Sequence, residues 1–435
     1  MLLGVVADDL TGATDVALMI SRQGMKTVQT IGVPSRAEFG DAEAVVVALK
    51  SRTIAAGEAV ALSLAAASAL RSAGAEQLLF KYCSTFDSTD AGNIGPVAEA
   101  LLGLVGSDLT IACPAFPAAG RSIYLGHLFV GDALLSDSSM KDHPLTPMRD
   151  ANLARVLQRQ VKGRVGLIRL AVVERGAAVI RDALQAARAE GKRIVIVDAT
   201  RDEHLRAIGA ACSDMPLITG GSGVAMGLPD NFRAAGRLAS RVPPLTLAAP
   251  AGKPAILAGS CSAATRDQVR VAIEAGTPAL LIDPLAIAAG ATTADQVSAF
   301  MIENTGARPA LVYSSADPAA VGAVQSKLGA QRAGALVEDL LAEVGRTLLT
   351  NGFTRFLIAG GETSGAVVGA LGVTALRIGP EIDPGVPWTR SVGAPDVALA
   401  LKSGNFGAPD FFLKAWTLLT DGASEPSPDE TRRQT

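Results

Sequence analysis

Short apolar runs alternate along the chain with alanine-rich helical stretches. Residues 2–7 are continuously apolar, which is typical of a strand buried on both faces. Helical stretches at 57–74 and 176–191 separate some of the later strand-like runs, which cover residues 44–48, 78–80, 109–112, 165–170, 193–197 and 217–219. This alternation predicts an α/β fold built on a mostly parallel sheet.

A second set of apolar runs begins after a proline-rich stretch. Residues 240–254 contain four prolines and no hydrophobic period, which is typical of a domain boundary. Further strands are predicted at 255–258, 279–282, 310–313, 355–358 and 375–378. The length of 435 residues also exceeds what one core usually organises. We therefore expect two domains, 1–242 and 253–421, each a mostly parallel sheet flanked by helices, followed by a disordered tail at 422–435.

Composition argues against several classes of protein. The formal net charge is −3 and aromatic residues make up 4% of the chain, so nucleic acid is not an expected partner. No segment is long and apolar enough to span a bilayer, so no membrane is expected either. The N-terminal run lacks a basic leader, and the four cysteines form no C-x-x-C pair. Both features favour a reduced, cytoplasmic protein.

Acidic residues follow the first predicted strand. Asp8 and Asp9 end the run at 2–7, and a helix is predicted to start at Val16. Ligands of open α/β sheets bind at the carboxyl ends of strands. Two adjacent carboxylates repel each other unless a cation or a hydroxyl ligand compensates them. Asp8 and Asp9 are therefore candidate binding residues, whereas Asp15 is interpreted as a helix cap or a first-turn residue.

Cations follow two other predicted strands of the first half. Lys81 comes directly after the run at 78–80, and Arg121 follows the run at 109–112. A sheet edge that combines carboxylates, cations and hydroxyls suits a polyol carrying a carboxylate, because acids accept hydroxyl protons and cations pair with the acid group. The alternative is a set of surface loops with ordinary salt bridges.

A glycine-rich turn follows the apolar run at 355–358. Its backbone N–H groups and the helix that follows can bind an anion. Gly360 and Gly361 allow close approach of the backbone, and Thr363 or Ser364 is predicted to cap the helix. A plain, tight strand-to-helix turn is the alternative.

Two further polar turns, 259–262 and 402–407, follow in the second half. Together with Lys402 they could hold a nucleotide triphosphate without a Walker loop, which the chain lacks. The turn at 217–227 nearly matches a dinucleotide fingerprint, but Met226 stands where the third glycine belongs.

Five motifs, in this order, resemble those of the four-carbon acid sugar kinase family. They are Ala-Asp-Asp-Leu-Thr-Gly-Ala-Thr-Asp (7–15), Lys-Tyr-Cys-Ser-Thr-Phe-Asp-Ser-Thr (81–89), Gly-Ser-Cys-Ser (259–262), Gly-Gly-Glu-Thr-Ser-Gly (360–365) and Lys-Ser-Gly-Asn-Phe-Gly (402–407). Each motif alone has modest specificity, but the ordered set is specific and covers nearly the whole chain.

The resemblance implies an N-terminal domain that holds the acid sugar, a C-terminal domain that holds ATP, and an active site in the cleft between them. It also implies transfer of a phosphoryl group from ATP to the C4 hydroxyl of a four-carbon acid sugar. Substrate contacts are expected at Asp8, Asp9, Lys81 and Arg121. ATP contacts are expected at Ser260, Gly360, Gly361, Glu362, Thr363 and Gly404.

Phosphoryl transfer depends mainly on positioning and charge stabilisation. We expect Asp9, or alternatively Asp8, to receive the proton of the C4 hydroxyl, while Lys81 and Arg121 orient the carboxylate end. Mg²⁺ is expected to bridge the phosphates, through Glu362 or water, although the sequence does not identify its ligands.

Several alternatives stay open at this point. Within the family, the substrate could be D-erythronate or D-threonate. A nucleotide-dependent oxidoreductase and a non-catalytic sugar-acid sensor belong to other classes. The sequence leaves the subunit count open, with a homodimer as one option.

Overall fold

The apolar run at the start of the chain forms β1 (Leu3–Ala7) in a computed structural model of the protein, and all five of its residues are buried. Such a strand is covered on both faces, as the pattern predicts.

The structure describes residues 1–34, 39–142, 146–240, 245–306, 308–314, 324 and 326–419. The expected tail at 422–435 lies outside the described residues. The chain divides into two units, Met1–Pro243 and Pro244–Thr435.

The main sheet of the first unit has the strand order β2-β3-β1-β4-β11-β5-β10-β9, and its neighbouring strands all run parallel. Besides β1, it contains β2 (Thr27–Ile31), β3 (Ala44–Ala48), β4 (Gln77–Lys81), β5 (Thr110–Cys113), β9 (Arg164–Ile168), β10 (Lys192–Val197) and β11 (Leu217–Gly220). The chain leaves β1 toward β2 and later returns to β4 on the other side, so the strand order reverses beside β1. Such a reversal is where ligands of open α/β sheets bind.

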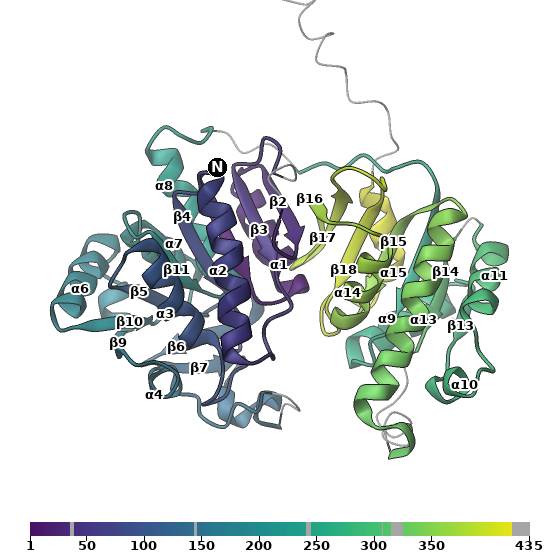
Figure 1. The fold of residues 1–435 in the computed structure, drawn as a ribbon, viewed down its shortest axis with the longest axis horizontal. Helices are drawn as coiled ribbons and strands as arrows, with labels where there is room; N and C mark the ends of the chain where they lie inside the picture. The colour runs from purple at the N-terminus through teal and green to yellow at the C-terminus, as the bar shows by residue number, and fades with distance from the viewer. Residues whose placement is uncertain are drawn as a thin grey trace, which may run out of the picture. The chain divides into compact units, whose positions relative to one another are not determined.

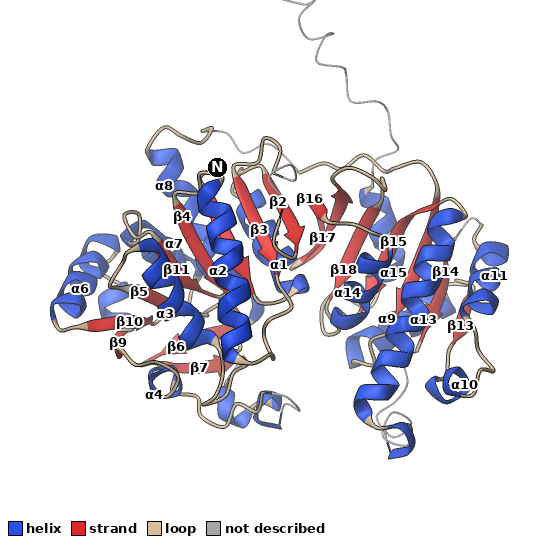
Figure 2. Ribbon diagram, viewed as in Figure 1, coloured by secondary structure: helices blue, strands red, loops and turns tan. Residues whose placement is uncertain are grey.

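Helices lie along both faces of this sheet (Figures 1 and 2). The right-handed crossovers from β1 to β2 and from β3 to β4 run in opposite directions, so they place α1 and α2 on opposite faces. The helices of the first unit are α1 (Leu10–Arg22), α2 (Ala56–Ser72), α3 (Ile94–Val105), α4 (Leu153–Gln158), α5 (Leu170–Val173), α6 (Ala177–Ala189), α7 (Asp202–Ala211) and α8 (Leu228–Ala234).

A small antiparallel sheet with the strand order β6-β7-β8 interrupts the alternation. Its strands are β6 (Arg121–Tyr124), β7 (His127–Val130) and β8 (Ala133–Leu134). Buried Asp198 anchors the turn between β6 and β7, because its carboxylate accepts the N–H of Leu125 at 2.7 Å and that of Gly126 at 2.9 Å. This anchoring fixes the hairpin that begins at Arg121.

The sheet of the second unit has the order β13-β14-β12-β15-β18-β17-β16. Its strands are β12 (Lys253–Ala258), β13 (Ala279–Leu281), β14 (Ala310–Tyr313), β15 (Phe353–Ala359), β16 (Ala375–Asp383), β17 (Val386–Ser391) and β18 (Ala398–Lys402). Neighbouring strands in the order β13-β14-β12-β15-β18 run parallel to each other. β17 pairs antiparallel with β18, and β16 pairs antiparallel with β17. The expected α/β class with mostly parallel sheets is confirmed.

The described helices of the second unit are α9 (Ala263–Glu274), α10 (Pro284–Ala288), α11 (Ala294–Asn304), α13 (Ala330–Thr350), α14 (Gly361–Ala370) and α15 (Phe411–Lys414). Buried Trp388 of β17 joins the strand face to the C-terminal helices, because its indole N–H donates to the Ala415 carbonyl at 2.7 Å. Among the described residues of both units, no helix combines the length and apolarity that a bilayer span requires.

Candidate active site

The register of the first sheet brings three loops together. Ala7 of β1 pairs with Ala48 of β3 and with Lys81 of β4, and the three strands run parallel. Their carboxyl ends therefore meet at one edge of the sheet. Asp8 follows β1 directly, and Arg52 lies in the loop after β3. The register therefore brings these residues and Lys81 close together.

Asp8, Asp9, Arg52 and Lys81 form an ion cluster at this edge. The Arg52 guanidinium forms two bonds to Asp8, from Nε to Oδ2 and from Nη2 to Oδ1, both 2.8 Å long. Nη2 also donates to Asp9 Oδ1 at 2.6 Å. Lys81 Nζ lies 3.2 Å from Asp9 Oδ1 and 3.9 Å from Asp8 Oδ1. The two cations compensate the repulsion between the adjacent carboxylates of Asp8 and Asp9.

The two carboxylates differ in exposure and in pKa. The side chain of Asp8 is 5% exposed and that of Asp9 is 25% exposed. Burial raises the pKa of Asp8, against the opposing charges of Arg52 and Lys81. Burial also acts upward on the pKa of Asp9, but Lys81 and Arg52 hold it well below its ordinary value. Of the two carboxylates, Asp9 is therefore the one that is both ionised and in contact with solvent.

Asp9 has a second task as the N-cap of α1. Its Oδ2 accepts the N–H of Gly12 at 3.1 Å and the hydroxyl of Thr11 at 2.9 Å. The sequence predicts a helix start at Val16, with Asp15 as its cap or in its first turn. Both predictions are wrong, because Asp9 satisfies the free N–H groups at the helix start and the helix begins at Leu10.

The ion cluster occupies the space where a side chain of residue 12 would lie, and Gly12 has no side chain. A Cβ at this position would lie 1.8 Å from Lys81 Nζ and 2.3 Å from Asp9 Oδ1. Both distances are far below contact distance, so any side chain at Gly12 would displace the ammonium or the carboxylate. The absence of a side chain at residue 12 is a condition for the geometry of the cluster.

The loop that carries Arg52 is itself held in place. The amide of buried Asn93 donates to the carbonyls of Ser51 at 2.8 Å, Arg52 at 3.2 Å and Ile54 at 3.3 Å. On the other side of the guanidinium, Asp87 Oδ2 lies 3.9 Å from Nη1. These contacts hold the Arg52 loop in the position that lets it reach Asp8 and Asp9.

The structure does not bring Arg121 into the cluster. Its guanidinium donates to the carbonyl of Ala119, within its own turn, and its Nε is buried without a partner among the described residues. Among the described residues, the partners of Asp8 and Asp9 are Arg52, Lys81 and groups of the α1 start, and Arg121 is not one of them. Arg121 as a substrate contact therefore stays a prediction.

Sequence analysis missed Arg52. The signal is present in the sequence, because Arg52 is a cation four residues past the predicted strand at 44–48. A cation after a strand end lies where ligands of open α/β sheets bind.

In the second unit, three turns meet at one edge of the sheet. Ala359 of β15 pairs with Ala258 of β12 and with Lys402 of β18, in parallel register. The turns that follow these strands begin at Gly259, Gly360 and Ser403. The expectation that the first two turns share an edge is confirmed, and the third joins them there.

The turn before α14 depends on glycine. Gly360 has φ +127° and its N–H donates to the Lys402 carbonyl at 2.8 Å. A Cβ at Gly259 would lie 2.1 Å from Thr363 Oγ1. Gly361 has open space around it and, like Glu362, is exposed. The loop after Ile358 therefore presents its helix N-terminus to solvent, as an anion site requires.

The predicted cap of α14 is wrong. The helix begins at Gly361 with Gly360 as its N-cap, and no side chain accepts a bond there. Thr363 and Ser364 lie inside the first turn and are buried, which removes them from the cap position. No side chain at the cap therefore competes with a ligand for the start of this helix.

A chain of hydroxyls links the first and third turns. Ser260 Oγ accepts the N–H of Ser262 at 3.2 Å, and Ser262 caps α9 through the N–H of Thr265 at 3.2 Å. The hydroxyls of Ser262 and Thr265 both donate to the carbonyl of Gly404. A Cβ at Gly404 would lie 2.7 Å from Ser260 Oγ. The residues expected to contact ATP thus lie in adjoining turns of one unit.

These turns fit a phosphate group better than a bare metal ion. They supply glycine-lined backbone, helix N-termini and hydroxyls, which are donors to anions. No cluster of three or more His, Cys, Asp or Glu side chains that could hold a metal occurs among the described residues. Protein ligands for Mg²⁺ stay unassigned.

The glycine-rich turn at 217–227 is packed rather than open. It leads into a 3₁₀ helix, Ser222–Gly227, whose residues are all buried. A Cβ at Gly220 would lie 2.3 Å from the Cys113 carbonyl oxygen, and one at Gly223 would lie 2.5 Å from that of Ala115. These glycines allow close packing inside the first unit, so the turn cannot receive a dinucleotide pyrophosphate.

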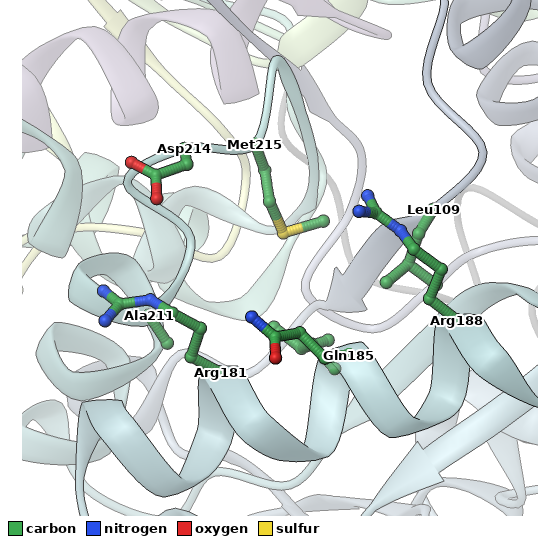
Figure 3. A pocket seen from close by; sticks show the side chains of 8 residues that line it. Leu109, Arg181, Gln185, Arg188, Ala211, Asp214 and Met215 are labelled. Atoms are coloured by element: carbon green, nitrogen blue, oxygen red, sulfur yellow. The ribbon is translucent and has the colours of Figure 1, made fainter.

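A hollow in the first unit is lined by side chains of other elements (Figure 3). It is lined by Leu109, Arg181, Leu184, Gln185, Arg188, Ala211, Asp214 and Met215. Leu109 and Met215 precede β5 and β11, so the hollow lies at the amino ends of the strands, whereas the ion cluster lies at their carboxyl ends. Arg188 already pairs with Asp108 at 2.9 Å. The hollow is therefore separate from the candidate site.

Two family models divide the chain as the two candidate sites do. A model described as "Sugar-binding N-terminal domain" matches residues 3–228, and one described as "Nucleotide-binding C-terminal domain" matches residues 255–412. The chain belongs to the four-carbon acid sugar kinase family. The resemblance read from the five motifs is confirmed.

Individual relatives of this family match over nearly their full length. A 3-oxo-tetronate kinase from Cupriavidus necator is 58% identical over 95% of this chain and 96% of its own. One from Burkholderia multivorans is 56% identical over 97% of this chain and 98% of its own. A solved structure from Salmonella typhimurium LT2, described as a candidate tRNA synthase, is 40% identical with a TM-score of 0.88, covering 96% of this chain and 99% of that one.

Proposed function

We propose that this protein is an ATP-dependent kinase that phosphorylates the C4 hydroxyl of 3-oxo-tetronate. The observation that carries the proposal is the near-complete alignment, at 54–58% identity, with curated 3-oxo-tetronate kinases. The separate match of a sugar-binding half and a nucleotide-binding half supports the same reaction. Kinases of D-erythronate or D-threonate, within the same family, are the second candidate.

The ion cluster suits the acid sugar. We propose that Arg52 and Lys81 attract the substrate carboxylate and that Asp9 accepts the proton of the C4 hydroxyl, because Asp9 is the more exposed acid and is ionised. Asp8 is the more buried acid, so a substrate hydroxyl reaches it less easily than it reaches Asp9. Arg121 is proposed as a further contact to the carboxylate end.

The turns of the second unit suit the phosphates of ATP. We propose that Ser260, Gly360, Gly361, Glu362, Thr363 and Gly404 line the nucleotide site. Mg²⁺ bound to the phosphates of ATP would supply charge neutralisation at these turns. Transfer requires the acid sugar and the γ-phosphate of ATP to meet in one site.

The function is tested by a panel of four-carbon acids. We expect ADP release with MgATP and 3-oxo-tetronate. For D-erythronate and D-threonate we expect kcat/KM to be at least about tenfold lower. These acids carry a hydroxyl in place of the oxo group, and in a polar site that change leaves a buried group of the protein unpaired. Turnover of D-erythronate or D-threonate that exceeds turnover of 3-oxo-tetronate would select the second candidate. Nicotinamide binding without ATP turnover would contradict a kinase.

Replacing Gly259 by Ala tests the nucleotide site. The added methyl would meet Thr363 Oγ1 at 2.1 Å and push the first two turns apart. We expect the KM for ATP to rise about tenfold, the loss of roughly one hydrogen bond, with the KM for the acid sugar unchanged. Gly365→Ala is the matched control, because that helical glycine has open space around it. Equal ATP KM values in both variants would remove Gly259 from the site.

A further inference from the structure

Lys402, at the end of β18, is fully buried. Sequence analysis placed it among the groups that converge on the anion. The structure instead shows its ammonium donating to the Thr265 hydroxyl at 3.0 Å, the Ser403 carbonyl at 3.0 Å and the Gly404 carbonyl at 2.8 Å. An ammonium has three N–H donors, so these three oxygens satisfy all of them. No direct contact with a bound phosphate is left for Lys402.

The two carbonyls that Lys402 holds belong to the turn expected to contact ATP. In a trans peptide the C=O and the following N–H point in opposite directions. A Ser403 carbonyl directed at the buried ammonium therefore directs the Gly404 N–H away from it. The Gly404 carbonyl does the same for the N–H of Asn405, which is an exposed residue. Successive N–H groups turned to the same side form an anion-binding concavity.

Neighbouring residues of α9 hold the same turn. Thr265 accepts from Lys402 and donates to the Gly404 carbonyl at 3.1 Å. The amide of Gln268, one helical turn later, donates to the carbonyls of Phe406 at 3.0 Å and Gly407 at 2.9 Å. Both α9 side chains are fully buried. Buried donors of Thr265, Gln268 and Lys402 thus hold the inner side of the turn, and its exposed side can contact a ligand.

A buried lysine without a carboxylate partner is unfavourable. Burial alone lowers the pKa of Lys402 to about 7. Among the described residues, no charged group on the surrounding elements offsets this burial. An apolar side chain would fill the space without that cost, so the hydrogen bonds to the turn are what the ammonium contributes.

We propose that Lys402 is a positioning residue that orients the N–H groups of Gly404 and Asn405 toward the phosphates of the nucleotide. The inference rests on the proposed function and deepens it, because it assigns the 403–405 turn to the phosphates rather than to the adenosine. Lys402 acts through the backbone and does not touch the nucleotide.

The test compares ligands with and without phosphates on the full-length protein. Binding of ADP, of a non-hydrolysable ATP analogue and of adenosine is measured by isothermal titration calorimetry for the wild type and for Lys402→Met. We expect the affinity for ADP and the analogue to fall about 30-fold, which corresponds to the loss of one charge-assisted hydrogen-bond set, and the affinity for adenosine to change less than about twofold. Lys162→Met, at an exposed position of the first unit, is the matched control.

A milder pair keeps the test informative if Lys402→Met does not fold. Thr265→Val removes the hydroxyl that Lys402 holds and preserves the shape, whereas Thr265→Ser keeps the hydroxyl. We expect Thr265→Val to weaken ADP binding about fivefold and Thr265→Ser to restore it. The KM for the acid sugar should stay within about twofold in both variants.

The outcomes separate this inference from the proposed function. Wild-type protein that binds no adenine nucleotide overturns both. Wild-type protein that binds ADP, with Lys402→Met binding it equally well, overturns the role of Lys402 alone. Equal losses for ADP and adenosine also overturn it, because they would mean a general collapse of the site rather than a misdirected phosphate turn.

Discussion

Replacing Asp9 by Asn is expected to lower kcat about 100- to 10,000-fold with both substrates saturating, the range typical for removal of a general base. Asn cannot accept the proton of the C4 hydroxyl. It does keep the N-cap of α1, because an Asn oxygen accepts the same N–H bond that Gly12 gives to Asp9. The fold should therefore persist, and the loss should fall on kcat rather than on the start of the helix. Coupled ADP-release kinetics measure it.

Asp41→Asn is the matched control, since Asp41 is an exposed acid that pairs with exposed Lys26. It should leave kcat within about twofold, as exposed ion pairs contribute little. A loss smaller than about tenfold for Asp9→Asn, with unfolding temperature and ATP KM unchanged, would exclude a proton-accepting role. Repeating the measurement with Asp8→Asn then asks whether the more buried acid takes that role.

Replacing Gly12 by Ala is expected to lower kcat/KM for the acid sugar about 100-fold. The added methyl would occupy the place of Lys81 Nζ, so either the ammonium or the Asp9 carboxylate must move. A displacement of about 1 Å in a positioned group is enough for such a loss. ATP affinity, measured by calorimetry without the acid sugar, should remain unchanged, because Gly12 lies in the first unit.

Gly57→Ala provides the control for this variant. Gly57 also lies in the first turn of a helix, α2, but nothing surrounds its would-be Cβ within 4 Å. There the substitution should raise stability by about 0.5–1 kcal/mol, because Ala is the better helix former, and leave activity unchanged. If Gly12→Ala behaves like Gly57→Ala in both stability and kinetics, the ion cluster is not part of the site.

The sequence predicted the fold class well where burial is uniform. Strands such as β1 and β3 are covered on both faces, so they appear as unbroken apolar runs. It missed β2, because Thr27, Gln29 and Thr30 give that strand a polar pattern although all three are buried. It also missed β17 and β18, which follow β16 as part of an antiparallel hairpin rather than after a crossover helix.

By itself the sequence determined five short motifs and their order along the chain, and so the family, since a short motif depends only on local order. Tertiary structure alone decided the partners of those residues. Arg52 contacts Asp8 across 44 positions and Lys402 contacts Thr265 across 137. Such contacts depend on which strands are neighbours in the sheet. That order follows from the packing of the whole domain, to which any one stretch of sequence contributes only a part.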